Sequence, residues 1–253
     1  MLSMQCMPES LKTERENLLK AIDGIRSRIT TRKLKNNPYY LCDSIKKNIL
    51  ELNNNPQNSK TCKERIGMSI RHFHDFYGWK SKDNENNFGL CSGSFYRTLG
   101  FIDIDPKTRS GKQSDKKTDF GVHIEHTIPV NVIRAILIKN VDETTSLQEI
   151  FEMILDYSVC TGVSRKDENE IINNGHARSH PQIMDGNPLP HEEIKPFSRY
   201  KDGTIIYSIL SGGTVPLDSN LKSINDHRSE YDIFKWEFIN YNYGKPLSQE
   251  TSI

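Results

Sequence analysis

An amphipathic helix with a defined start, placed between two strand-like segments, constrains the fold of this chain more than any other feature. Ser146 and Glu149 form a Ser-x-x-Glu capping box, a pattern that satisfies exposed backbone N–H groups at a helix N-terminus. The apolar residues that follow recur at helical spacing and are Leu147, Ile150, Phe151, Ile154 and Leu155. Residues 157–163 then read as a strand, and Ser164 fits the N-cap of a further helix.

The first part of the chain reads as helical. Apolar residues recur at intervals of three, four and seven in two stripes, Leu11, Leu18, Ile22, Ile25 and Ile29, and then Leu41, Ile45, Ile49 and Leu52. The polar run 53–60 has the composition of a linker, and the next helical face contains Cys62, Ile66, Ile70, Phe73 and Tyr77. Near Asp83 the pattern changes, because aromatic and β-branched residues in 94–104 favour strand. We therefore expect an α+β protein with an N-terminal helical region, 1–82, and a mixed region, 83–253. Within the mixed region, the tail 179–196 is rich in Pro, His and Gly and reads as irregular, and short strands are expected near 203–209 and 231–238.

Composition excludes several classes of protein. Hydrophobic residues make up 35% and charged residues 26% of the 253 residues, which is typical of a folded protein. No apolar run approaches the roughly 20 residues that cross a bilayer, and the N-terminus lacks the order of a secretory signal. We expect a cytoplasmic protein that has no membrane partner. Five scattered cysteines without a CxxC pair favour reduced thiols over a disulfide framework or a common structural zinc site.

The charge balance does not by itself indicate a nucleic-acid partner. The chain has 34 Lys and Arg against 33 Asp and Glu, a formal net charge of +1, so affinity for DNA has to come from local patches. One such patch lies in the Gly- and Ser-containing loop 107–117, where Lys112 and Lys116 are candidates for phosphate contact.

Two short segments contain the residues with catalytic potential. The first is His123-Ile124-Glu125-His126-Thr127-Ile128-Pro129. A histidine near neutral pKa can take a proton from water, and a neighbouring carboxylate can hold a hard cation such as Mg²⁺. The second, about forty residues later, is Val163-Ser164-Arg165-Lys166-Asp167-Glu168-Asn169, in which an amide oxygen stands early in the expected helix.

Together these segments resemble the two halves of an HNH endonuclease motif. The resemblance implies a ββα-metal module, with His126 as the general base and Glu125 and Asn169 as metal ligands. Asp167 is the next candidate ligand if Asn169 is not one. His123 either supports a metal ligand or contacts phosphate, with a structural role as the alternative. The implied cofactor is Mg²⁺, with Mn²⁺ as an alternative. Two features depart from the common pattern: a long helical insertion separates the halves, and the carboxylate is Glu where many members have Asp or His.

A looser likeness continues downstream. The segments His176-Ala177-Arg178-Ser179-His180-Pro181 and Phe197-Ser198-Arg199-Tyr200 resemble parts of bacterial HNH-type endonucleases, several of them associated with restriction. Arg165, Arg178 and Arg199 are DNA-contact candidates because a guanidinium forks onto phosphate or guanine. Residues 83–253 would then form the catalytic region with a C-terminal accessory segment for DNA recognition.

The resemblance favours a sequence-specific type II restriction endonuclease that acts on double-stranded DNA. A phage or mobile-element HNH nuclease would share the same site, and a DNA-binding protein that keeps the fold without cleaving is a third option. A homodimer is expected only from the two-fold symmetry of palindromic targets. A zinc deaminase is disfavoured because His123-Ile124-Glu125 is not followed by Pro-Cys-x-x-Cys, and neither an HExxH nor a nucleotide-binding glycine motif is present.

Overall fold

The computed structural model describes most of the chain between Pro38 and Pro216. The described residues are 38–73, 94, 96–105, 108–110, 119–172, 178–190, 193–208 and 214–216, together with Lys12 and Glu16. Several sequence-based expectations fall outside them: the stripe from Leu11 to Ile29, Tyr77, the boundary near Asp83, the contacts of Lys112 and Lys116, residues 176–177 of the downstream segment, and a strand near 231–238. Among the described residues, no helix has the length and apolar character that crossing a bilayer requires.

The first two described helices form a hairpin. Helix α2, Pro38–Asn54, is followed by a single 3₁₀ turn, η1, Pro56–Asn58, and by helix α3, Ser59–Phe73, which packs back on α2. The predicted linker therefore contains the turn that reverses the chain. Most apolar members of the two expected stripes are buried: Leu41, Ile45, Ile49, Cys62, Ile66, Ile70 and Phe73. Leu52, at the end of the first stripe, is only partly buried, and Tyr77 lies outside the described residues.

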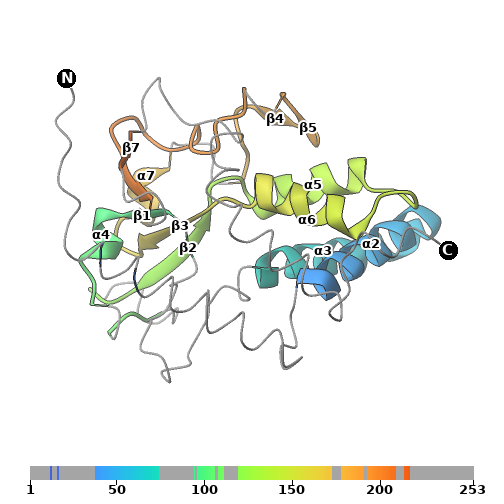
Figure 1. Ribbon diagram of the computed structural model, residues 1–253, viewed down its shortest axis with the longest axis horizontal. Coiled ribbons are helices and arrows are strands. Elements are labelled where there is room, and N and C mark those ends of the chain that lie inside the picture. The colour runs from blue at the N-terminus through green and yellow to red at the C-terminus, as the bar shows by residue number, and fades with distance from the viewer. Residues whose placement is uncertain are drawn as a thin grey trace.

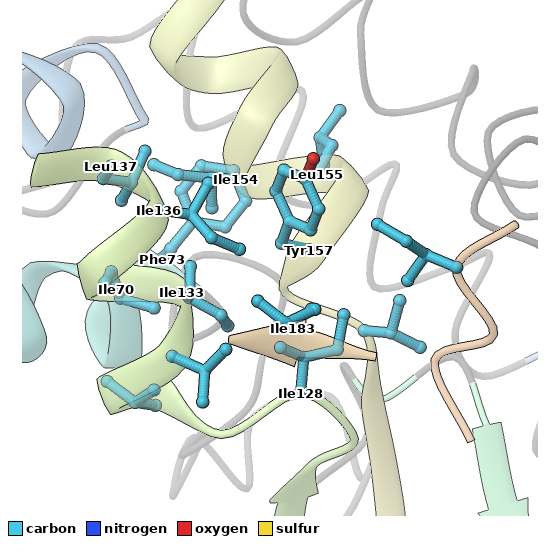
Figure 2. Close-up of a cluster of buried hydrophobic side chains, with 14 of the residues drawn as sticks. Ile70, Phe73, Ile128, Ile133, Ile136, Leu137, Ile154, Leu155, Tyr157 and Ile183 are labelled. Atoms are coloured by element: carbon cyan, nitrogen blue, oxygen red, sulfur yellow. The ribbon is translucent and has the colours of Figure 1, made fainter. Parts of the chain in front are cut away.

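Two further helices pack against this hairpin. Helix α5, Val130–Asn140, packs against α3, and helix α6, Leu147–Tyr157, packs against α2. Figure 1 shows these four helices on one side of the molecule and strands β1, β2 and β3 on the other. Figure 2 shows that side chains of α3, α5 and α6 meet Ile128 and Ile183 in one buried cluster. That core joins residues from before and after Asp83.

Helix α6 begins as the sequence predicts. The Ser146 hydroxyl accepts a hydrogen bond from the Glu149 backbone N–H at 3.2 Å, and the Glu149 carboxylate accepts one from the Ser146 backbone N–H at 2.7 Å. The hydrogen bond from the Ser146 backbone lowers the pKa of the Glu149 carboxyl. Both halves of the capping box are therefore formed.

Loss of this cap has a predictable cost. Ser146→Ala removes the side-chain acceptor and should lower the free energy of unfolding by about 1 kcal/mol. Ser146→Thr is the matched control, since its hydroxyl can accept the same N–H group and donate to the Glu149 carboxylate, and it should keep most of the stability of the wild type. Urea denaturation of the three chains measures the difference, and equal stability of the Ala and Thr variants would contradict the prediction.

The strands form a five-stranded mixed sheet in the order β2-β3-β1-β6-β7. Their bounds are Tyr96–Thr98 for β1, Val122–His126 for β2, Cys160–Ser164 for β3, Ile205–Ser208 for β6 and Thr214–Pro216 for β7. Only β1 and β3 run parallel, and the other neighbours are antiparallel. Strand β6 confirms the strand expected near 203–209.

Two segments differ from the sequence-based expectation. Among the described residues of 94–104, strand is limited to Tyr96–Thr98. The Thr98 hydroxyl accepts the Phe101 backbone N–H at 3.4 Å and caps the one-turn helix α4, Leu99–Ile102. The Pro-rich tail contains a small hairpin of β4, Ile183–Met184, and β5, Asn187–Pro188. Asp185 and Gly186, both at positive φ, make its turn, as an Asp-Gly pair favours.

Strands β2 and β3 pair although α5 and α6 lie between them in the chain. Five antiparallel register pairs join them, from Val122 with Ser164 to His126 with Cys160. Strand β3 begins later than expected, since Tyr157 still belongs to α6. Helix α7, Glu168–Ile171, follows β3 after a turn in which the Ser164 hydroxyl accepts the Asp167 N–H at 3.0 Å. The two strands therefore pair despite the insertion of α5 and α6 between them, and the short helix α7 follows β3.

Candidate functional site

The alternation of side chains along β2 divides the candidate residues between two faces of the sheet. His123 and Glu125 lie on one face, while Ile124 and His126 lie on the other. His126 is 7% exposed, whereas the side chains of His123 and Glu125 are 32% and 14% exposed. The structure therefore brings His123, rather than His126, to the side of Glu125.

On the Glu125 face, a histidine lies between two carboxylates. His123 Nε2 is 3.7 Å from Glu125 Oε2 and also 3.7 Å from Glu168 Oε1. Glu168 is the first residue of α7, so the start of this helix lies over the face of β2 that presents Glu125.

Each carboxylate also pairs with an arginine. Arg199 Nη2 pairs with Glu125 Oε1, and Arg165 Nη1 pairs with Glu168 Oε2 at 2.9 Å. The Arg199 side chain is only 1% exposed, and burial lowers the pKa of its guanidinium. Two of the three arginines expected to contact DNA are thus turned toward carboxylates.

A short segment covers this face of the sheet and positions Arg199. The Phe197 ring meets Tyr96 of β1 edge-to-face at 5.0 Å and Tyr200 at 5.7 Å. Tyr200 is buried, which raises the pKa of its phenol to about 12. Ser198 lies with its hydroxyl 3.2 Å from His180 Nε2. The downstream segment Phe197–Tyr200 therefore packs on this face of the sheet, and His180 contacts it.

The two candidate ligands after β3 occupy different places. Asn169 is the second residue of α7, next to Glu168. The Asp167 carboxylate lies directly against Gly100 of α4, and α4 covers the opposite face of the sheet through Phe101 and Gly162. Asp167 therefore lies on the α4 side, whereas Glu168 reaches His123, the histidine that also approaches Glu125. Sequence reasoning missed Glu168, although it lies between the two candidate residues and the first turn of a helix after a strand was the signal.

The third candidate arginine, Arg178, is exposed. Its backbone carbonyl accepts a hydrogen bond from Asn131 Nδ2 of α5 at 2.9 Å, which ties its backbone to the helical part of the molecule. Of the three candidate arginines, only this one lies at the surface.

Comparison with protein-family models, curated proteins and solved structures finds no match to this chain.

Glu125 and Glu168 are the carboxylates of this face that could take part in holding a hard cation. Among the described residues, no group of three or more His, Cys, Asp or Glu side chains is already arranged around an ion position. Carboxylate and amide oxygens are nevertheless what Mg²⁺ and Mn²⁺ bind, and Glu125 and Glu168 both approach one imidazole. Glu125 also pairs with a positively charged group, the guanidinium of Arg199.

The face opposite Glu125 is closely packed. A Cβ atom added at Gly162 of β3 would lie 2.9 Å from the Phe101 ring and 2.9 Å from the Ser94 hydroxyl. The guanidinium groups of Arg97 and Arg109 lie 5.1 and 4.0 Å from the centroid of the same ring, so the ring has little freedom to move. Glycine at this position lets α4 approach the sheet.

Gly162→Ala should therefore lower the free energy of unfolding by roughly 1–3 kcal/mol, because the added methyl group overpacks this contact. Gly203→Ala is a useful contrast, since nothing lies within 4 Å of a Cβ there and its positive φ alone carries the cost. Thermal unfolding compares the chains. A Gly162→Ala variant as stable as the wild type would show that α4 shifts freely.

Proposed function

We propose that this protein is a metal-dependent endonuclease of the HNH kind that hydrolyses phosphodiester bonds in double-stranded DNA. The observation that supports it most is the antiparallel pairing of β2 with β3, followed directly by α7. This arrangement brings the Glu125 carboxylate and the start of α7 to the same imidazole.

Glu125 is the first residue that we propose as a ligand of the cation. Helix α7 would supply the others from Asn169 or Glu168, which are adjacent at its start. Oxygen ligands of this kind fit Mg²⁺ or Mn²⁺. A divalent cation bound there would stabilise negative charge on the phosphate and on the leaving oxygen.

The proposed proton acceptor is His126, the last residue of β2. It projects from the opposite side of the strand to Glu125. In phosphodiester hydrolysis the attacking water and the leaving oxygen lie on opposite sides of the phosphorus. A base and a cation ligand that diverge at a strand end are compatible with that geometry. His123 lies between the two carboxylates and would orient them.

A restriction endonuclease is the form of this activity that we propose, because the chain has material beyond the catalytic elements. The helical hairpin of α2 and α3 packs on α5 and α6, and Arg178 is exposed beside α5. These parts are available to read the DNA target, with Lys112 and Lys116 as further phosphate contacts.

Plasmid cleavage tests the proposal. Supercoiled plasmid of known sequence is incubated with the purified chain and Mg²⁺ or Mn²⁺, and the product ends are mapped by sequencing. We expect linear products with defined ends, and no products when EDTA is added. DNA that is bound but left intact with either ion would favour a non-cleaving DNA-binding protein.

A further inference from the structure

The buried pair of Arg199 and Glu125 is not explained by DNA contact. The Arg199 side chain is 1% exposed and its guanidinium pairs with Glu125 Oε1. Because a guanidinium remains charged in proteins, a fixed positive charge occupies one oxygen of the carboxylate that we propose as a cation ligand.

The residues on either side of Arg199 are packed, which fixes the position of its side chain. Phe197 and Tyr200, on either side of it in the chain, are both buried and in edge-to-face contact with each other. Phe197 also meets Tyr96 of β1. The arginine is therefore presented to Glu125 from a packed segment, so that little conformational freedom has to be lost to keep the pair formed.

The second arginine provides a comparison within the same site. Arg165 pairs with Glu168, whose side chain is 27% exposed, so water screens this pair more than the pair of Arg199 with Glu125. Removal of each positive charge should therefore have different consequences for a cation bound at Glu125.

We propose that Arg199 is a built-in counter-cation that orients the Glu125 carboxylate and competes with the divalent cation for it, and so sets the cation affinity of the site. This inference rests on the proposed function. A cation that binds Glu125 has to replace or share the interaction with Arg199. The free energy needed to weaken the Arg199–Glu125 pair therefore makes the free energy of cation binding less favourable. Arg199 is thus a positioning residue, and the site takes up its cation less tightly than the carboxylates alone would.

Binding of Mn²⁺ to the full chain tests the proposal, by titration calorimetry and by the electron paramagnetic resonance signal of the unbound ion. Because a charge-assisted hydrogen bond contributes about a factor of ten or more to an equilibrium constant, Arg199→Gln should bind Mn²⁺ at least about tenfold more tightly than the wild type. Arg199→Lys keeps the charge and should stay close to the wild type. Arg165→Gln is the matched control and should change the affinity less than Arg199→Gln does.

Unchanged or weaker Mn²⁺ binding by Arg199→Gln would overturn the proposal, because a purely structural arginine gives that result. In the Glu125→Gln background the effect of Arg199→Gln should disappear, and an effect that persists there would also overturn it. If Arg199→Gln is unfolded in the absence of Mn²⁺, refolding of this variant at low Mn²⁺ concentration would likewise indicate tight binding of the ion. A variant that stays unfolded at saturating Mn²⁺ overturns the proposal.

These measurements also separate the inference from the proposed function. If Arg199→Gln binds Mn²⁺ more tightly but the wild type cleaves no DNA, the role of Arg199 is supported and the proposed nuclease activity is contradicted. If the wild type cleaves DNA but Arg199→Gln binds Mn²⁺ with unchanged affinity, the nuclease proposal is supported and the role of Arg199 is overturned. Absence of Mn²⁺ binding to either chain overturns both.

Discussion

Glu125→Gln should lower metal-dependent DNA cleavage by about two to three orders of magnitude, the effect typical of losing one electrostatic contact to a transition state. The amide keeps the size of the side chain and removes the negative charge that would hold the cation. Binding of Mn²⁺ should weaken in parallel. Initial rates of plasmid cleavage, measured with Mg²⁺ and with Mn²⁺, give the effect.

Two controls make this result interpretable. Glu193→Gln makes the same chemical change at an exposed position outside the site and should leave cleavage unchanged. Glu125→Gln also leaves Arg199 buried without its carboxylate, which can cost about 3–5 kcal/mol of stability, so the rates are compared well below the melting temperature of the variant. A folded Glu125→Gln chain that cleaves as fast as the wild type would remove Glu125 from the mechanism.

The parts of the fold that depend on neighbouring residues were predictable from the sequence. The capping box of Ser146 and Glu149 is formed as expected, and the stripe of α2 is buried on the expected side. Each depends on contacts within one or two helical turns, so a local pattern is sufficient. The period of two along β2 likewise implies that His123 and Glu125 share a face.

What the sequence could not show depends on residues far apart in the chain. Arg199 was expected to contact DNA because it is an arginine near a motif, and only the packing of Phe197 on β1 explains why it reaches Glu125 instead. Strand propensity in 94–104 was overridden by one hydroxyl, that of Thr98, which caps a helical turn. Glu168 became a candidate only when the start of α7 was placed over β2.

The two histidines of β2 should respond differently to substitution. His126→Asn keeps a polar side chain of similar size and cannot act as a base near neutral pH, so cleavage should fall by about two to four orders of magnitude. Binding of Mn²⁺ should stay close to that of the wild type, because the Glu125 face is unchanged. His123→Asn should lower cleavage less, since it removes contacts that orient Glu125 and Glu168 but not the proton acceptor.

Burial decides how this comparison has to be made. His126 is 7% exposed and lies on the face that carries Ile124, so its substitution also lowers stability, and asparagine limits the cavity that alanine would leave. Circular dichroism melts of both variants set the assay temperature. If His123→Asn loses more cleavage than His126→Asn, the proton acceptor lies on the Glu125 face, between the two carboxylates. The buried histidine then serves packing alone.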